Sequence, residues 1–442
     1  MNQTNRIIRV IGGGLAGCEA ALFLSNRGWK VRLSEMRPRQ MTPAHQTAGL
    51  AELVCSNSLK SQRTDHASGL LKEELTMLGC QLLQIARECA IPSGDALAVD
   101  RSHFSRLVEQ AIWESGIQRI TETISSIPEE WVEQDVVIIA TGPLTTENLM
   151  NHLQEWLGEA QSYFFDAIAP ILESNSLDQR FAFRANRHDN TTGTGDYWNC
   201  PLDESQYHKL VDALVQAERV EVRGFERSRL FERCQPVEEI ARSGLDALRF
   251  GPMRPIGLYD PKTGKQPYAV VQLRSEDSSG RMVNMVGFQT RLKWSEQKRV
   301  FRMIPALHSA EFCRFGVMHR NAYIQSNGQF KLNFSHQTHP SLFFCGQISG
   351  VEGYVESIAS GWYVGMQIDR RLRGLPAIEL PEETLMGSLF RYLLTTPDAK
   401  PMYANFGLLP EIRAPKKEQR KKKATRALEA LEQWIRLEPM NE

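Results

Sequence analysis

The chain has 442 residues, of which 42% are hydrophobic and 24% are charged, a balance typical of a globular protein with a large buried core. Its apolar runs are too short to span a membrane, and its first six residues are polar, so we expect a cytoplasmic protein with no membrane partner. The eight cysteines are scattered without a C-x-x-C pair, which argues against a zinc ribbon or a disulfide framework.

The first elements have the pattern of a βαβ unit. A β-branched run at residues 7–11 predicts a buried strand. A helix is expected from about residue 15 to 27, with Gly28 at its C-terminal end, and a second strand over residues 30–33. Two adjacent parallel strands joined by a helix form one edge of an α/β domain.

A glycine motif lies between the first strand and the helix. Gly12, Gly14 and Gly17 have the spacing G-x-G-x-x-G, which permits a tight turn, close approach of a pyrophosphate, and packing of the helix on the strand. Glu35 follows the second strand, where a carboxylate accepts hydrogen bonds from ribose hydroxyls. The sequence therefore predicts a dinucleotide site with the phosphates at the helix N-terminus. A glycine-rich turn with only a structural role is the alternative.

A long loop region is expected after Glu35. It contains Cys55 at the edge of an apolar patch, where either a functional thiol or a small structural residue fits the pattern. Apolar spacing over residues 70–87 then predicts one amphipathic helix, and residues 101–115 a further helix.

A buried strand is expected at residues 136–143, ending in Ala-Thr-Gly. The small residues Thr141 and Gly142 at its end permit backbone to approach a bound dinucleotide closely, so this strand supports the same site.

The middle of the chain changes pattern at about residue 151. Short strand-like runs at 181–183, 269–273 and 283–288 alternate with turns, which predicts an inserted α+β domain with antiparallel pairing. The insertion carries Cys234 and a cluster of arginines, for which anion contact and surface ion pairing are both open. The arginines are Arg227, Arg229, Arg233, Arg242, Arg249 and Arg254.

The chain is expected to return to the first domain late in the sequence. A strand at 341–347 is followed by a glycine-rich loop and a helix in which Gly353, Ser357 and Gly361 recur every four residues. Such spacing gives the helix one smooth face for a cofactor or a sheet. The dinucleotide-binding domain would then be discontinuous.

The C-terminal part carries an uneven share of the charge. Residues 413–426 hold eight Lys or Arg and one acid, leaving 44 basic and 51 acidic residues elsewhere. A basic segment on an acidic body suits a polyanion such as RNA, whereas a solvated tail is the bland alternative. An apolar stripe at 428–435 predicts a terminal helix.

Taken together, long stretches of the chain resemble the TrmFO family, folate- and FAD-dependent uracil-5-methyltransferases of tRNA that are related to the MnmG (GidA) wobble-uridine enzymes. The resemblance runs from residue 7 to about 411 and rests on the order and number of its motifs. They include GGGLAGCEAA, TPAHQT, LAELVCSNSLKS, SGDALAVDR, ATGPLT, FGPMRPIGL, GVMHRN, GVEGYVESIASG and ANFGLLPE.

The resemblance implies an α/β fold with a discontinuous Rossmann-like FAD-binding domain and an inserted α+β domain. The implied parts are residues 1–150 and 305–412 for FAD, 151–304 for the insertion, and 413–442 for a basic tail and helix. The implied FAD-binding residues are Gly12, Gly13, Gly14, Leu15, Ala16, Gly17, Glu35, Arg37, Thr141, Gly142, Gly346 and Gln347.

The resemblance also implies the reaction. Methylenetetrahydrofolate would give the one-carbon unit to carbon 5 of the T-loop uridine of tRNA, and FADH₂ regenerated by NAD(P)H would supply the electrons. His319 and Arg320 are expected at the folate, and the RNA-binding residues are expected to be Lys416, Lys417, Arg420, Lys421, Lys422 and Lys423.

Two cysteines match functional positions of the family, Cys55 and Cys234. Carbon 5 of uracil is a poor nucleophile until a thiolate adds at carbon 6. We assign that addition to Cys234 and a partner role in proton transfer to Cys55, with the reverse assignment open. Three other functions also stay open: the same chemistry on ribosomal RNA, an MnmG-like wobble-uridine modification, and an RNA-binding flavoprotein without methylation. The oligomeric state is not predicted.

Overall fold

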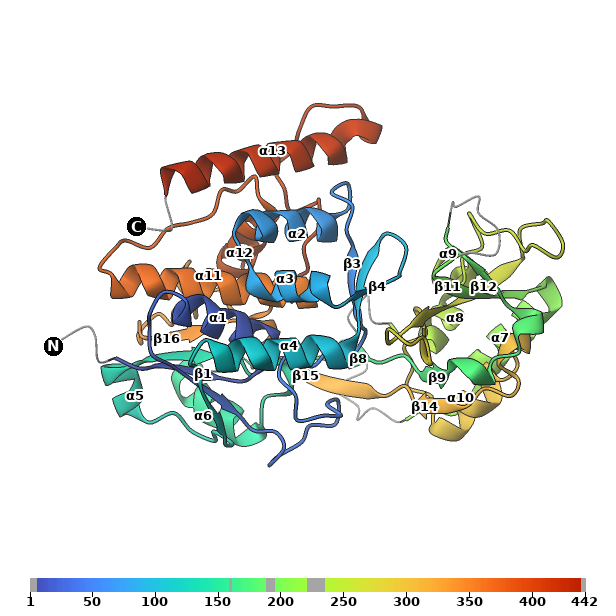
Figure 1. Ribbon diagram of the computed structural model, residues 1–442, viewed down its shortest axis with the longest axis horizontal. Coiled ribbons are helices and arrows are strands. Elements are labelled where there is room, and N and C mark those ends of the chain that lie inside the picture. The colour runs from blue at the N-terminus through green and yellow to red at the C-terminus, as the bar shows by residue number, and fades with distance from the viewer. Residues whose placement is uncertain (1–5, 159–160, 188–194, 221–234, 439–442) are drawn as a thin grey trace.

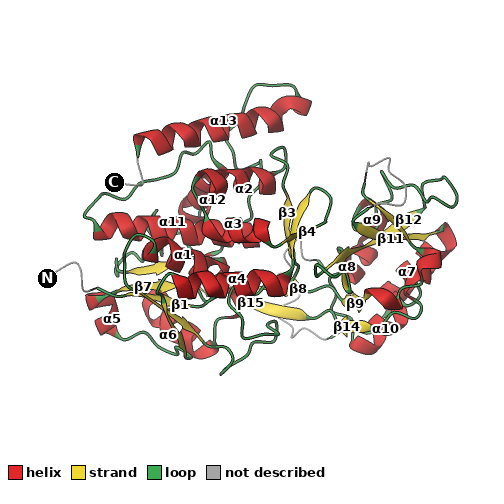
Figure 2. Cartoon of the chain, viewed as in Figure 1, coloured by secondary structure: helices red, strands yellow, loops and turns green. Residues whose placement is uncertain are grey.

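The computed structural model describes residues 6–158, 161–187, 195–220 and 235–438, and for residues 161–166, 319 and 320 it describes the backbone alone. The chain forms a larger and a smaller lobe (Figure 1). Helices dominate the larger lobe, whereas the smaller one is built around strands (Figure 2).

A parallel sheet of five strands organises the larger lobe, in the order β16-β7-β1-β2-β6. Its strands are β1 (Ile8–Ile11), β2 (Val31–Glu35), β6 (Gln118–Thr121), β7 (Val136–Ile139) and β16 (Leu342–Phe344). The predicted late strand thus pairs with β7, although the whole smaller lobe lies between the two in the sequence. This sheet confirms the predicted α/β class with a Rossmann-like, discontinuous parallel sheet.

Helices cover this sheet and extend the larger lobe. They are α1 (Leu15–Ser25), α2 (Ala67–Met77), α3 (Gln81–Glu88), α4 (Arg101–Glu114), α5 (Glu129–Gln134), α6 (Glu147–Leu157), α11 (Tyr354–Leu372), α12 (Leu385–Thr395) and α13 (Lys416–Leu437). A small antiparallel sheet lies at the side facing the second lobe, formed by β3 (Ser58–Ser61), β4 (Ala90–Ile91) and β5 (Ala96–Val99). Within the described part of the chain, no helix is both long and apolar enough to cross a bilayer.

The small-residue face of α11 packs mainly on α1. A Cβ at Gly361 would lie 2.2 Å from the carbonyl oxygen of Ala16, and one at Gly365 would lie 2.9 Å from the ring of Phe23. Gly361 therefore serves close contact between two helices, whereas Ser357 on the same face lines the pocket described below.

An antiparallel sheet of six strands forms the core of the smaller lobe, in the order β10-β11-β12-β13-β9-β14. Its strands are β9 (Ile171–Glu173), β10 (Phe183–Ala185), β11 (Tyr197–Leu202), β12 (Ala269–Ser275), β13 (Met282–Met285) and β14 (Phe312–Arg314). Its helices are α7 (Glu204–Gln216), α8 (Val237–Ser243), α9 (Ala247–Phe250) and α10 (Trp294–Phe301). The antiparallel α+β character agrees with the expectation for the middle of the chain.

Two long strands connect the lobes. They are β8 (Gln161–Ala167) and β15 (Met318–Ile324), which pair antiparallel over their whole length (Figure 1). The chain thus leaves and re-enters the larger lobe side by side. The domain boundaries given above stay a prediction.

Several predicted elements need correction. The single helix expected over residues 70–87 is two helices, α2 and α3, because Gly79 lies between them in the left-handed region at φ +71°. The strand expected at 181–183 begins at Phe183, and the one at 283–288 ends at Met285. The basic segment is no extended tail, because α13 begins at Lys416 and includes most of it.

Two buried carboxyl groups accept hydrogen bonds from the N-terminal N–H groups of helices that lie far from them in the sequence. Glu74 of α2 accepts the backbone N–H groups of Leu385 and Met386, at 2.7 and 3.0 Å, at the start of α12. Glu19 of α1 accepts those of Gln81 and Leu82 at the start of α3, at 3.2 and 2.8 Å. Burial raises the pKa of both carboxyls to about 7, although the hydrogen bonds oppose it.

This geometry predicts a pH-dependent effect of Glu74→Gln. A raised pKa means that folding favours the protonated carboxyl, so its stabilisation is complete below about pH 4.5 and is lost as the pH rises through about 7. Because glutamine does not titrate, the variant's deficit in unfolding free energy should be larger at pH 5.5 than at pH 8.5, by about 2 kcal/mol. Urea unfolding at both pH values measures this. An equal deficit would mean that Glu74 does not titrate in this range.

Candidate active site

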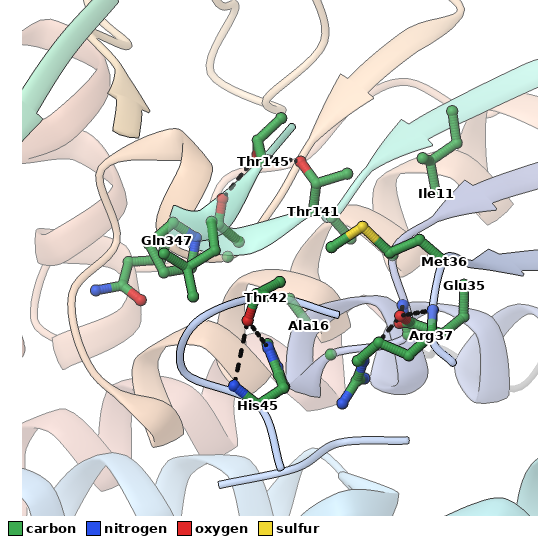
Figure 3. Close-up of a pocket in the computed structure, with 18 of the residues that line it drawn as sticks. Ile11, Ala16, Glu35, Met36, Arg37, Thr42, His45, Thr141, Thr145 and Gln347 are labelled. Carbon is green, nitrogen blue, oxygen red and sulfur yellow. Dashed lines mark hydrogen bonds and ion pairs between the residues drawn. The ribbon is translucent and has the colours of Figure 1, made fainter. Parts of the chain in front are cut away.

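A pocket with an empty volume of about 1040 Å³ opens at the carboxyl ends of β1, β2 and β7, where α/β sheets bind nucleotides. Its walls come from the glycine motif, the loop after β2, the loop after β7 and the turn before α11 (Figure 3). Of the twelve residues expected at FAD, the lining includes Gly12, Gly13, Gly14, Leu15, Ala16, Glu35, Arg37, Thr141, Gly142, Gly346 and Gln347.

Gly17 does not line the pocket, and the three glycines of the motif have different roles. A Cβ at Gly17 would lie 2.0 Å from the carbonyl oxygen of Gly12, and one at Gly12 would lie 2.5 Å from that of Ala140. Gly12 also has a φ of +106°. These two positions therefore need glycine for packing and turn geometry. A Cβ at Gly14, in contrast, would meet no described atom within 4 Å. The space beside Gly14, at the start of α1, fits a pyrophosphate.

Glu35 and Arg37 form a buried pair on the pocket wall (Figure 3). One Glu35 oxygen accepts the N–H of Gly13 at 2.9 Å, and the other accepts the backbone N–H and Nε of Arg37 at 3.0 and 2.9 Å. Burial disfavours the charge on Glu35, but these hydrogen bonds and the guanidinium prevail and lower its pKa. Arg37 also donates to Glu52 at 3.1 Å. An ionised Glu35 thus fixes the glycine loop, and its carboxylate still faces the pocket.

The opposite wall consists of residues from both ends of the chain. Thr141 and Thr145 share a hydrogen bond of 2.6 Å, and Gln347 donates to Glu352 at 2.6 Å. The N–H of Gly346 donates to the hydroxyl of Ser360 at 2.7 Å. β16 and α11 therefore complete a pocket that the N-terminal part of the chain begins.

Sequence reasoning missed several lining residues. Thr42 and His45, which share a hydrogen bond of 2.6 Å, close one side of the pocket from the loop after β2, and Tyr354 comes from the start of α11 (Figure 3 shows the first two). The TPAHQT motif that contains Thr42 and His45 was the available signal.

The turn that carries Cys55 borders this pocket. Its neighbour Val54 and the ring of Tyr354 both line the pocket. The hydroxyl oxygen of Tyr354 accepts the N–H groups of Cys55 and Ser56 at 2.7 and 3.2 Å. Cys55 itself is half-buried. The structure thus brings one of the two predicted thiols to the edge of the predicted cofactor site.

Three arginines hold the same turn from other elements. Arg314 of β14 donates to the carbonyl oxygens of Val54 and Ala44 at 3.1 and 2.9 Å. Arg101 donates to that of Leu53 at 2.7 Å. Burial and the nearby Arg101 lower the pKa of Arg314, while Glu52, Tyr354 and the Cys55 thiol oppose that shift.

The third is Arg274 of β12, whose Nη2 lies 2.7 Å from Ser56 Oγ and whose Nε lies 3.0 Å from Asn57 Oδ1. Both Arg274 and Arg314 belong to the six-stranded sheet, so the smaller lobe positions the thiol turn of the larger one. Sequence spacing gave no signal for these contacts, because the partners come from distant parts of the chain.

Three other predicted site residues are described only in part or not at all. Cys234 lies outside the described residues. His319 and Arg320 are described only by their backbone in β15, where they pair with Asp166 and Phe165 of β8.

The six predicted RNA-binding residues all lie on α13. Lys416, Lys417, Arg420 and Lys421 are at least partly exposed. Lys422 pairs with Glu418 at 3.1 Å, and Lys423 donates to the carbonyl oxygens of Phe406 and Leu409 at 3.0 Å each. Lys423 therefore holds a loop to the helix.

The parallel sheet, the glycine loop and the pocket define a dinucleotide-binding protein with a Rossmann-like domain. The family model described as "Glucose inhibited division protein A" matches residues 7–376. Among solved structures, GidA of Aquifex aeolicus superposes with a TM-score of 0.70 at 14% identity, over 98% of this chain and 74% of that one, which confirms the fold.

Curated relatives are far more similar in sequence. The methylenetetrahydrofolate–tRNA-(uracil-5-)-methyltransferase TrmFO of Thermotoga neapolitana is 52% identical over 98% of this chain and 100% of its own length. That of Desulfitobacterium hafniense is 49% identical, over 97% and 98% respectively. The chain therefore belongs to the TrmFO family within the GidA-related proteins.

Proposed function

We propose that the protein methylates carbon 5 of the T-loop uridine of tRNA in the cytoplasm, with methylenetetrahydrofolate as one-carbon donor and FAD, reduced by NAD(P)H, as source of electrons. Membership of the TrmFO family and the names of its curated relatives support this function. The observation that carries it is the Cys55 turn, which shares Tyr354 with the dinucleotide pocket. A thiol at that edge suits addition to a pyrimidine ring presented to the cofactor.

The residues that line the pocket fit the parts of FAD. The open space at Gly14 would receive the pyrophosphate, Glu35 would face the ribose, and Thr141, Gly142, Gly346 and Gln347 would line the remainder. When bound, FAD supplies reducing equivalents for the new methyl group. The loop that carries Thr42 and His45 contributes one side of the pocket.

The two thiols would divide the chemistry on the uracil. One adds at carbon 6, which makes carbon 5 nucleophilic, and the other assists removal of the proton from carbon 5. We assign addition to Cys234 and proton handling to Cys55, and we assign His319 and Arg320 to the folate. The target base must leave the T-loop stack to reach either thiol.

Arg314 is expected to position the turn that carries Cys55, because its guanidinium donates to the carbonyl oxygens of Val54 and Ala44. Arg314→Met removes a positive charge close to the thiol and two hydrogen bonds from its turn. We expect alkylation of Cys55 by iodoacetamide to require a higher pH in this variant than in the wild type, because the thiolate loses a nearby positive charge. Arg314→Lys should restore much of the charge effect. An unchanged alkylation profile in Arg314→Met would contradict this role.

The proposed function is tested with purified protein, unmodified tRNA, methylenetetrahydrofolate and NADPH. Nucleoside mass spectrometry should detect new 5-methyluridine in the T-loop. Product on ribosomal RNA alone would instead favour that substrate. A preparation that binds FAD but modifies neither RNA would contradict the proposal.

A further inference from the structure

A second cavity lies outside the dinucleotide pocket, with an empty volume of about 970 Å³. It is formed by the end of β3, the start of α2, the loop at residues 404–407 and α13. We call it the β3 cavity and define it by Lys60, Glu356, Asn405, Phe406 and Arg420. This cavity takes no part in the FAD binding or in the thiol chemistry proposed above.

Lys60 supplies a first positive charge at this cavity and is held there by an ion pair. Nζ of Lys60, whose side chain is 41% exposed, lies 3.7 Å from Oε1 of the buried Glu356. Lys60 has a φ of +65°, a conformation that a residue with a side chain adopts at a cost in free energy. Strain of this kind persists where the surroundings require one side-chain position.

Glu356 is buried behind Lys60 in the cavity wall. Its Oε1 accepts the N–H of Ala404 at 3.2 Å, whereas its buried Oε2 has no hydrogen-bond partner among the residues that the structure describes. A buried carboxylate oxygen without a donor is costly. This Oε2 lies against the backbone of Gly353, where an added Cβ would be 2.2 Å from it, so it is closed to a ligand and the carboxylate serves to hold Lys60.

Arg420 supplies a second cation. Ala424, Ala427 and Leu431 are the buried residues of α13, and Arg420 lies one turn before Ala424 on the same face. Its side chain is exposed and lines the cavity. Lys423 fastens the neighbouring loop to α13 through Phe406 and Leu409, so the cavity wall and the basic helix form one surface.

The cavity also lies close to the thiol turn. Lys60 follows Cys55 by five positions in the sequence, and such a segment spans at most about 17 Å. That distance corresponds to about five stacked nucleotides. An RNA strand whose target base is at Cys55 therefore has neighbouring nucleotides within reach of the β3 cavity.

We propose that the β3 cavity binds one nucleotide of the RNA substrate that flanks the target uridine. Lys60 and Arg420 would contact its phosphate, and the buried Glu356 would hold Lys60 in position. Phe406 offers a ring for the base to stack on. Inorganic phosphate would contact only the two cations and would leave the ring of Phe406 without a stacked base. This inference rests on the proposed function in that the substrate is RNA.

The test compares Arg420→Ala with Arg436→Ala. Both remove one arginine from an exposed position of α13, but Arg436 pairs with Glu432 on the surface, about 24 Å along the helix. The dissociation constant of unmodified tRNA is measured with the flavin-loaded full chain from 50 to 200 mM NaCl. Arg420→Ala should raise it roughly five- to tenfold and reduce the salt dependence by about one phosphate contact, whereas Arg436→Ala should stay within about twofold.

Two results would overturn the inference: no weakening in Arg420→Ala, or equal weakening in both variants. A second measurement places p-benzoylphenylalanine at Phe406, where irradiation should cross-link tRNA close to the T-loop uridine; absence of a cross-link there also overturns it. Because both readouts are of binding, a wild-type protein that binds tRNA without methylating it would contradict the proposed function and leave this inference standing.

Discussion

Replacing Cys55 by alanine should reduce formation of 5-methyluridine by at least about a thousandfold, because the reaction needs a thiol at the edge of the cofactor pocket. The flavin content of the protein should not change. Cys55 is connected to the pocket through its neighbour Val54 and the hydroxyl of Tyr354, and its own side chain is not part of the lining. The measurements are a methylation rate and the visible flavin absorbance of the same preparation.

The control for this substitution is Cys313→Ala, an exposed cysteine of β14 in the smaller lobe. It should keep the wild-type rate. A Cys55→Ala variant with more than about a tenth of wild-type activity would contradict the assignment, since a nucleophile or an essential proton carrier cannot be replaced by a methyl group. Cys234→Ala should likewise lose methylation and retain flavin.

Gly14→Val should remove FAD while leaving the protein folded. Gly14 has φ −78° and ψ −172°, which valine also adopts, and a Cβ there would meet no described atom within 4 Å. The added methyl groups would instead occupy the space of the pyrophosphate. We expect FAD affinity to fall at least about a hundredfold, equivalent to about 2.7 kcal/mol, with an unchanged far-UV circular dichroism spectrum.

Gly17→Ala provides the contrast. Its Cβ would lie 2.0 Å from the carbonyl oxygen of Gly12, so helix α1 must shift from the strand. This variant should lower the melting temperature of the flavin-free protein as well, because it disturbs packing. If Gly14→Val unfolded the protein to the same extent as Gly17→Ala, the distinction between a phosphate position and a packing position would be wrong.

The sequence predicted the βαβ unit beside the pocket because its signals are local. The β-branched run, the glycine spacing and Glu35 occupy one βαβ unit, so strand, turn and helix follow from neighbouring residues. The break at Gly79 was missed because apolar spacing continues across it. A glycine inside a helical pattern was the available warning, and its left-handed backbone ends α2.

Contacts between distant segments explain what sequence reasoning missed. Arg274 and Arg314 reach the Cys55 turn from strands of the smaller lobe, and no periodicity reports which arginine of a sheet points to a loop in a distant part of the chain. The basic segment shows the same limit. Its composition predicted charge, but the burial of Ala424, Ala427 and Leu431 makes it a packed helix.

The pairing of β16 with β7 has a consequence for biosynthesis. A ribosome that has completed β7 must still synthesise the whole smaller lobe before β16 and α11 exist. At a synthesis rate of about 5–20 residues per second, the 205 residues from the end of β7 to the end of β16 take roughly 10–40 s, and β7 waits that long for its neighbouring strand. During that interval the nascent chain exposes an unpaired strand edge and half of a cofactor pocket. Flavin incorporation is therefore expected only near the end of translation.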